Sequence, residues 1–461
     1  MHRRAVFAAL AIVVVAARFC HVKILWVEEA YPMAAAIQLL HGKALYRDVI
    51  FDKPPLSPLF YLLFGAWPGW PLRVAGSVFV IACAYAIYRF GKDAWGEFEG
   101  LAAAVLLVFS LTFWIPSAVM ALAPDALMIL PHIVAVWLAW RGKAFASGIV
   151  CGLALATNAK GVFVLAACAL WCYKEGPKLM AGFAIPTAAT LAWFGRDYVD
   201  QVWTWGLQYS AATFVTHPIR EGLMRTGNWA GFHAILVLGL IALYVHVNKG
   251  EDDGRGRIAG WIVLSMIAVC GGLRFFPRYY FHLLPPMCLA AARGIALMPR
   301  YRGFAFALLL IPMLRFGPRY VTLAGDMAQG REHQWMDLAM SQDSEAAAAI
   351  VSASAGPGDT ILAWGYRPDV LARTRLPLGT RLLDSQAVTG VLADRHLTTA
   401  EAQIGGLEAN RAAFAAAAPT VIVDGLAIYN PALAVGKYRA MDGYRQAGRT
   451  GHTIVYRRAA K

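Results

Sequence analysis

Charge is scarce in this sequence. Asp, Glu, Lys and Arg make up 15% of its 461 residues and hydrophobic residues 59%, whereas a soluble domain carries about 25% charged residues. The P-loop, zinc-protease, nucleophile-elbow and dinucleotide-binding motifs are all missing from the positions where they would act. The seven cysteines lie within or beside apolar segments, with no metal-spaced pair on a polar loop, which argues against a disulfide scaffold or a zinc module: Cys20, Cys83, Cys151, Cys168, Cys172, Cys270 and Cys288.

Long apolar runs are abundant instead. Runs of 15–20 residues are long enough to cross a bilayer when helical, and they are continuous, whereas the strands of a membrane barrel alternate. The sequence therefore predicts an α-helical polytopic membrane protein with about eleven transmembrane helices. We expect these near residues 5–22, 72–88, 100–114, 126–140, 144–157, 161–173, 180–194, 229–247, 258–273, 282–298 and 303–317.

The net charge of +14 does not indicate nucleic-acid binding, because much of the Lys and Arg lies in short loops between apolar runs. Counting 144–173 as two passes gives thirteen Lys and Arg in 37 inner-loop residues, against ten in 105 outer-loop residues. That is the positive-inside pattern of a plasma-membrane protein with a cytoplasmic N-terminus. A single pass there would put the basic loop 249–257 outside. A cleaved signal peptide is the alternative for residues 1–20, but Arg18, His21 and Lys23 favour an uncleaved helix.

The composition changes near residue 325. Residues 360–364 and 420–424 are short apolar runs typical of strands, residues 453–456 offer a third strand, and an Ala-rich helical stretch spans 399–418. We therefore expect a transmembrane domain at 1–320 and a small C-terminal α/β domain at 325–461. An odd number of passes from an inner N-terminus places this domain on the outer, extracytoplasmic face.

The first outer loop, residues 23–71, holds the densest group of polar residues. Glu28 and Glu29 are carboxylates of the kind that serve as general bases, although carboxylates also favour a helix N-terminus. Lys53 precedes two prolines that fix its backbone, which suits a phosphate anchor, and an interfacial lysine is the alternative.

Further charged residues emerge on the predicted outer face. Asp125 stands at a helix start, where Asp is a common cap. Lys160 lies between two apolar segments, where a charge is costly unless it reaches water or an anion. A basic and aromatic segment contains Arg274, Arg278 and Tyr279. Arginine suits contacts with planar anions. The alternative is an aromatic belt at the membrane interface with snorkelling arginines.

Taken in order, these motifs resemble the GT-C superfold of membrane glycosyltransferases, and in particular glycosyltransferase family 39, the protein O-mannosyltransferase and lipid A aminoarabinose transferase type. The residues that carry the resemblance are Glu28-Glu29, Tyr31, Gly42, Tyr46-Arg47-Asp48, Lys53-Pro54-Pro55, Asp125, Lys160-Gly161, Arg278-Tyr279, Pro285, Gly358-Asp359, Trp364-Gly365 and Pro419–Asp424. One departure is Glu28, where the family usually has Asp.

The resemblance implies sugar transfer, with inversion, from a polyprenyl-phosphate-linked donor to an envelope acceptor: a glycan, a lipid or a protein. Glu28 or Glu29 would deprotonate the acceptor, and Asp125 would hold the acceptor or support the base. Lys53, Arg278, Lys160 and Tyr279 would bind the donor phosphate, and the supporting residues would be Tyr31, Tyr46, Asp48, Asp52 and Arg274. Asp52 and His217 offer ligands for a divalent metal, although His217-Pro218 is equally typical of a turn; no other cofactor is expected.

The competing class is a transporter or flippase of a lipid-linked substrate. Transporters usually place ionisable residues at the bilayer midplane within broken helices, whereas here they cluster in predicted outer loops, which favours the enzyme. The resemblance assigns the C-terminal domain to covering the site or selecting the acceptor. Arg367, Arg373 and Arg381 would suit an anionic acceptor, but a solvated surface explains them equally well.

Overall fold

The computed structural model describes residues 3–212, 216–246, 254–332 and 335–459, and they divide into two compact units. Unit 1 contains residues 1–22, 73–193 and 213–333, and unit 2 contains residues 23–72, 194–212 and 334–461. The C-terminal residues thus fold together with the first predicted outer loop and with a second segment, 194–212. The domain limits at 320 and 325 remain a prediction.

Unit 1 is helical, and each of the eleven apolar segments expected to cross the membrane coincides with helix over most of its length. Residue 247 and residues 249–253 of the expected basic loop lie outside the described part of the chain. The helices are α1 (Arg3–Phe19), α4 (Trp70–Ala94), α5 (Glu97–Ser110), α6 (Pro116–Val119), α7 (Pro124–Leu127), α8 (Ile129–Trp140), α9 (Ala144–Thr157), α10 (Gly161–Cys172), α11 (Gly176–Tyr198), α13 (Pro218–Phe232), α14 (Ala234–Val245), α15 (Arg255–Cys270), η4 (Pro277–Leu283), α16 (Leu284–Ala296), α17 (Arg302–Ala307) and α18 (Leu310–Ala328).

Length limits how many of these helices cross a bilayer unaided. Within the described residues, three are long and apolar enough: Trp70–Ala94, Arg255–Leu273 and Pro299–Ala328. The pair α13 and α14 adds a fourth if it counts as one span, although it bends by 88°. Helices such as α9 and α10 are shorter than the roughly 20 residues that a span needs. The count of eleven spans therefore stays a prediction.

Helix α16 forms the centre of unit 1, because it packs against both α5 and α14. A Cβ on Gly294 of α16 would lie 1.8 Å from the carbonyl oxygen of Gly239 on α14. Small residues allow such close backbone approach between apolar helices. The unit also contains a largely buried ion pair, in which the Arg293 guanidinium lies 2.9 Å from the carboxylate of Glu99.

Unit 2 is built on a four-stranded sheet in the order β1-β2-β4-β3, in which β1 and β2 are parallel and the other pairs antiparallel. The strands are β1 (Ile361–Trp364), β2 (Val421–Asp424), β3 (Tyr444–Arg449) and β4 (Ile454–Arg458). The three expected strands are confirmed and β3 is additional. In the Ala-rich stretch 399–418 the helix is shorter than expected and spans only Glu408–Ala416.

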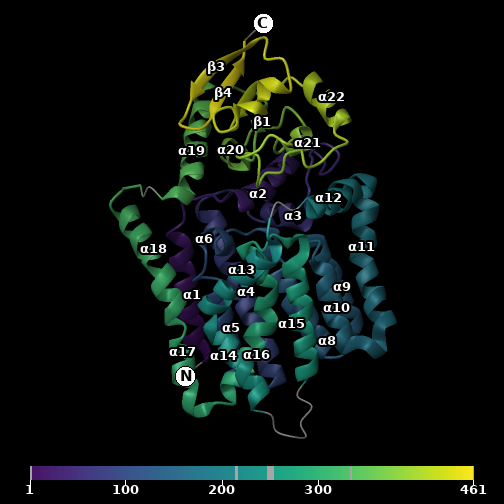
Figure 1. Ribbon diagram of the computed structural model, residues 1–461, viewed down its shortest axis with the longest axis vertical. Coiled ribbons are helices and arrows are strands. Elements are labelled where there is room, and N and C mark those ends of the chain that lie inside the picture. Colours follow the sequence, from purple (N-terminus) through teal and green to yellow (C-terminus); the bar gives the residue numbers. More distant parts are fainter. Residues whose placement is uncertain (1–2, 213–215, 247–253, 333–334, 460–461) are drawn as a thin grey trace. The chain divides into compact units, whose positions relative to one another are not determined.

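The helices of unit 2 cover both faces of this sheet. They are α2 (Val27–Leu40), α3 (Leu56–Leu62), the π-helix η2 (Val199–Thr204), α12 (Trp205–Ala211), α19 (Met336–Ser354), α20 (Pro368–Thr374), α21 (Gln386–Thr389) and α22 (Glu408–Ala416). Strand residues alternate between two cores: Ile361 and Ala363 face α2, α19 and α20, whereas Leu362 and Trp364 face α21 and α22. Figure 1 shows α19 and α20 beside the strands.

Helix α2 of the first predicted outer loop is an integral part of unit 2. The buried Gln38 amide donates to the Leu376 carbonyl over 3.1 Å, and its oxygen accepts the Leu378 amide over 2.8 Å. Buried amides are stable when both ends are paired in this way. The first predicted outer loop is thus held against residues 376–378.

Candidate active site

The acidic pair opens helix α2, and its two members differ. Glu29 is fully buried, and its Oε1 accepts the backbone amide of Trp26 over 3.2 Å. That bond caps the first turn of α2, as the capping-box pattern predicts. Glu28 is only half-buried. Glu29 thus has a structural role in the helix start, and Glu28 is the more accessible carboxylate.

Tyr46 fixes the loop that carries Lys53. Its φ of 67° lies in the left-handed region, which is strained for a bulky residue and is found where surrounding bonds enforce it. The Tyr46 carbonyl accepts the side chains of Gln201 and Arg381 over 2.6 and 2.8 Å, and its hydroxyl donates to the Lys53 carbonyl over 2.8 Å. Burial raises the pKa of the Tyr46 phenol well above its usual value, with Tyr198 and Asp52 contributing, so the hydroxyl remains a donor.

Lys53 is paired with its neighbour. Its Nζ lies 2.8 Å from the carboxylate of Asp52, whose side chain is 15% exposed, against 39% for Lys53. Asp52 in turn faces the carboxyl of Asp384, whose pKa is raised to about 6, first by burial, with the charge of Asp52 adding to the rise and Lys53 opposing it. The pKa of Tyr31 is also raised well above its usual value, by burial and then by these two carboxylates. The side chains of Tyr31, Asp52, Lys53 and Asp384 therefore form one electrostatic group.

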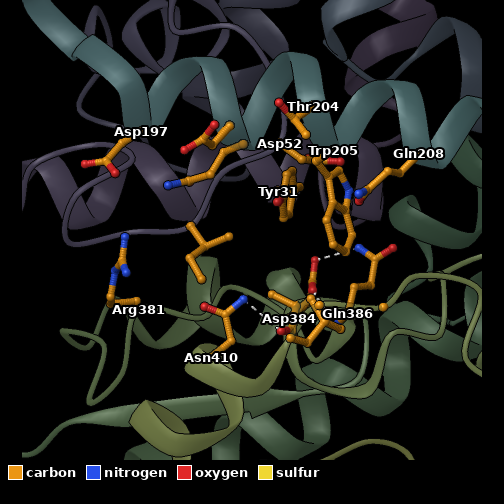
Figure 2. Close-up of a pocket in the computed structure, with 17 residues that line it drawn as sticks. Tyr31, Asp52, Asp197, Thr204, Trp205, Gln208, Arg381, Asp384, Gln386 and Asn410 are labelled. Carbon is orange, nitrogen blue, oxygen red and sulfur yellow. Dashed lines mark hydrogen bonds between the residues drawn. The ribbon is translucent and has the colours of Figure 1, made fainter.

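This group borders a cavity of about 440 Å³ that lies wholly within unit 2. Figure 2 shows Tyr31 and Trp205 projecting into it from one side, opposite Asp384 and Gln386. The complete lining is Tyr31, Ile50, Asp52, Asp197, Asp200, Gln201, Thr204, Trp205, Gln208, Arg381, Asp384, Gln386, Ala387, Gly405, Gly406, Leu407 and Asn410. Of the residues expected at the site, Tyr31 and Asp52 line this cavity.

The wall formed by residues 197–208 was not among the site residues expected from the sequence. Asp197, Gln201 and Trp205 recur every four residues, with Asp200, Thr204 and Gln208 beside them. That spacing marks one polar face of a helix. This polar helical face could have been recognised from the sequence, but residues 197–208 lie between the apolar segments expected at 180–194 and 229–247, in a stretch expected to be an outer loop.

A second polar cluster lies in unit 1 and links four expected residues. The Asp125 carboxylate is 3.6 Å from Nε of Arg278 and accepts the Asn158 side-chain amide over 3.1 Å. The Asn158 oxygen accepts the backbone amide of Lys160 over 3.0 Å, and Nζ of Lys160 lies 3.1 Å from the ring centroid of Tyr279. Because Tyr279 follows Arg278, the network closes on itself. It holds Arg278 beside a carboxylate and the Lys160 ammonium against an aromatic ring.

The backbone before this cluster is strained around Arg274. Leu273 and Phe275 have φ of 52° and 49°, in the left-handed region that non-glycine residues rarely adopt. The Arg274 side chain is fully buried, and the Arg225 guanidinium donates to its carbonyl over 3.2 Å. Strain of this kind often accompanies functional loops. Here the strained residues lie directly before the 3₁₀ helix η4, which carries Arg278.

Several expected residues serve local structure. The Asp48 carboxylate accepts the Ala44 amide over 2.8 Å and pairs with Arg47 over 3.0 Å; Arg47 is the main cause that lowers the Asp48 pKa to about 2. The buried Arg367 pairs with Asp343 over 3.3 Å. Arg373 pairs with Glu345 over 3.2 Å. Among these arginines and Arg381, only Arg381 lines the cavity.

The metal prediction finds little support in the donor atoms. His217 is exposed and precedes Pro218 at the start of α13, as a helix-starting turn would. Asp52 already binds the ammonium of Lys53. Throughout the described ranges, no three His, Cys, Asp or Glu side chains gather in a group that would hold a metal ion.

No protein-family model matches this chain, and no curated protein matches it significantly. Solved structures do. ArnT from Cupriavidus metallidurans, a lipid A aminoarabinose transferase whose structure was solved bound to undecaprenyl phosphate, superimposes with a TM-score of 0.63 at 12% identity. The match covers 98% of this chain and 97% of that one.

The oligosaccharyltransferase of Archaeoglobus fulgidus is also similar. Its complex with Zn and sulfate gives a TM-score of 0.51 at 12% identity, covering 98% of this chain and 73% of that one. The structure of the same enzyme, AglB, in complex with an inhibitory peptide and a dolichol-phosphate gives a TM-score of 0.50 at 11% identity. That match covers 92% of this chain and 71% of that one. At these identities the likeness establishes the fold, and the resemblance to the GT-C superfold is confirmed at that level.

Proposed function

We propose that this protein is a membrane glycosyltransferase that moves a sugar from a polyprenyl-phosphate-linked donor to an acceptor in the cell envelope. The observation that carries the proposal is a fold shared, over 98% of the chain, with a transferase whose structure holds undecaprenyl phosphate. AglB, solved with a dolichol-phosphate, supports the same donor class. The distribution of loop charges supports a cytoplasmic N-terminus and an extracytoplasmic unit 2.

Glu28 is the proposed general base. The acceptor oxygen attacks the anomeric carbon as its proton passes to the Glu28 carboxylate. The new bond joins the acceptor oxygen to the anomeric carbon, and the bond from that carbon to the phosphate oxygen breaks, with the electron pair leaving on the lipid phosphate. Attack from the face opposite the phosphate inverts the anomeric centre. Glu29 is less suited to this role because its carboxylate caps α2.

Negative charge develops on the departing phosphate, and preorganised cations stabilise such charge. Unit 1 offers Arg278 and Lys160, which are held by Asp125, Asn158 and the Tyr279 ring. Asp125 thus acts through Arg278, as a positioning residue. A separate candidate cation is Lys53 of unit 2, which is held by the Tyr46 hydroxyl and the Asp52 carboxylate.

A transfer assay tests the proposal. Wild-type protein, Glu28→Gln and Glu29→Gln would each receive a panel of radiolabelled polyprenyl-phosphate sugars and a membrane extract that supplies acceptors. We expect wild type to transfer label and Glu28→Gln to lose about 10²–10⁴-fold in rate, the usual contribution of a general base.

The outcomes separate the alternatives. Loss in Glu29→Gln with retention in Glu28→Gln would move the base to Glu29 and keep the enzyme. Absence of transfer by wild type, together with donor movement across the bilayer of liposomes that contain the protein, would replace the proposed transferase with a lipid flippase.

A further inference from the structure

The cavity of unit 2 combines two kinds of wall. Residues 197–208 supply a polar helical face with one large ring, Trp205, and the C-terminal residues supply Asp384, Gln386 and Asn410 (Figure 2). Its volume of about 440 Å³ falls in the range of ligand pockets, about 300–1,000 Å³. The lining is therefore large enough and polar enough to enclose a small hydrophilic ligand.

Trp205 gives this cavity a face for stacking. Its indole Nε1 is buried and has no hydrogen-bond partner among the residues that the structure describes. A tryptophan ring is electron-rich on its face, and it attracts the weakly positive C–H groups on one side of a sugar ring. An unpaired buried donor is costly, and a ligand hydroxyl would satisfy it.

The polar groups around Trp205 suit hydroxyl groups. Carboxylates accept hydrogen bonds, and Gln and Asn amides both donate and accept them, so together they can bond to hydroxyls that do both. Asp384 is itself held in place, because both of its oxygens accept the Gln386 backbone and side-chain amides over 2.8 and 2.9 Å. Asn410 is anchored by a bond from its amide to the Ala387 carbonyl over 3.0 Å.

The charge of the lining decides which ligands fit. Four carboxylates, Asp52, Asp197, Asp200 and Asp384, stand against a single guanidinium, Arg381. Lys53 and Arg196 neutralise part of this charge from outside the lining, by pairing with Asp52 and Asp200. Placing charges of the same sign next to each other costs several kcal/mol. The excess of carboxylates in the lining would therefore repel a ligand that carries a phosphate or uronate group.

We infer that this cavity binds the acceptor as an uncharged saccharide, stacked on Trp205 and hydrogen-bonded by Asp384 and the amides around it. The inference rests on the proposed function and names the acceptor class. Helix α2 connects the cavity with the proposed reaction. Tyr31 of α2 lines the cavity, and Glu28 lies three residues before it. Residues with this spacing lie on the same side of a helix. Glu28 is outside the lining, and the cavity thus borders the side of α2 that carries the proposed base.

Binding can be tested without turnover. Purified full-length protein in detergent, carrying a fluorescent label, would be applied to an immobilised array of neutral, amino and acidic oligosaccharides. We expect retention on neutral glycans, a loss of about tenfold in Trp205→Ala, corresponding to the roughly 1.4 kcal/mol of one aromatic contact, and recovery in Trp205→Phe. Leu207→Ala is the matched control, because Leu207 is 73% exposed on the same helix and lies outside the lining.

Retention mainly on acidic glycans, no retention on any glycan, or equal retention by wild type and Trp205→Ala would each overturn the inference. The array does not depend on transfer, so its result stays separate from a failure of the transferase assay. Where transfer is observed, Trp205→Ala should raise the acceptor KM and leave donor KM unchanged, and the labelled product should be a neutral glycan. A peptide or an acidic lipid as the labelled product would also overturn it.

Discussion

Asp125 holds Arg278 at a partly buried ion pair, with its carboxylate 3.6 Å from the guanidinium Nε. The side chains are 11% and 27% exposed, so water screens this pair less than an exposed one. The same carboxylate accepts a hydrogen bond from the side-chain amide of Asn158. The side-chain oxygen of Asn158 in turn accepts the backbone amide of Lys160. A single carboxylate therefore contacts Arg278 directly and the backbone of Lys160 through Asn158, and these are the two cations of unit 1 proposed to bind the donor phosphate.

Asp125→Asn keeps the shape of the side chain but removes its charge. We expect donor KM to rise by about 10–100-fold, because breaking a well-buried pair costs about 3–5 kcal/mol and this one is only partly buried. Steady-state transfer kinetics with varied donor would measure it. Asp93→Asn is the control, since Asp93 pairs with the exposed Arg141 over 3.8 Å and such pairs contribute little. An unchanged donor KM in Asp125→Asn would contradict the positioning role.

Lys53→Met tests the cation of unit 2. Its charge is held by Asp52 and its backbone by Tyr46, so we expect transfer to fall about 100-fold or more, as charge stabilisation of a leaving group commonly contributes. Tyr46→Phe should have a smaller effect, about fivefold, because it removes one hydrogen bond of about 1 kcal/mol. Lys23→Met, an exposed lysine of the same unit, is the control. Equal rates in Lys53→Met and Lys23→Met would refute the role.

Much of the helical architecture could be predicted because apolar runs leave few alternatives. The expected segments 144–157 and 161–173 correspond closely to α9 and α10, which end and begin around the polar Asn158 and Lys160. The number of bilayer crossings stays a prediction, because it depends on how short and bent helices such as α13 and α14 are placed in a bilayer.

The sheet was predicted at its buried and half-buried strands and missed at its exposed strand. β1 and β2 are buried throughout and read as apolar runs, whereas β3, Tyr444–Arg449, is an edge strand of mostly polar, exposed residues. The Ala-rich stretch was predicted as helix over too long a range, because Gly405 and Gly406 precede the helix and Gly406 has a φ of 73°. Glycine in that conformation ends helical structure.

The candidate site could be predicted only in part. The order of Glu28, Lys53 and Asp125 in the sequence led to the proposed chemistry. Asp384 and Trp205 lie far apart in sequence and line the same cavity only through folding. Neither carries a motif, and the bond from Gln201 to the Tyr46 carbonyl crosses 155 positions. Such pairings depend on tertiary packing, which a single sequence does not reveal.

The buried carboxyl of Asp384 should make unit 2 less stable as pH rises. Its pKa in the folded state, about 6, is raised from 3.8 by burial first. The folded state therefore holds this proton more tightly, and the resulting stability is present below pH 4 and is lost as pH rises through about 6. The difference corresponds to roughly 3 kcal/mol.

Thermal unfolding of wild type and Asp384→Asn at pH 4.5 and 7.5 would measure this contribution. We expect wild type to lose more stability than the variant between the two pH values, since Asn does not titrate. A parallel decline of both proteins would show that Asp384 does not titrate in this range. The glycan array at the same pH values would reveal whether ionised Asp384 improves saccharide binding, as its acceptor role predicts.

Asp424 closes the turn after β2, and its removal should disrupt unit 2. It is 1% exposed, and its carboxylate accepts three backbone amides, those of Leu426 and Ala427 over 2.9 Å and that of Val435 over 2.8 Å. Asp424→Ala leaves three buried donors unpaired, at about 1–3 kcal/mol each. We expect rapid proteolysis within residues 335–459 and loss of near-ultraviolet circular dichroism.

Asp424→Asn and Asp442→Ala make this prediction specific. Asn retains one oxygen acceptor but turns its amide toward Val435 or toward the other two donors, so an intermediate loss of stability is expected. Asp442 is exposed and its removal should be neutral. If Asp424→Ala resisted protease as well as Asp442→Ala does, the three amides would have to find other partners, and the carboxylate would not be what holds the end of β2.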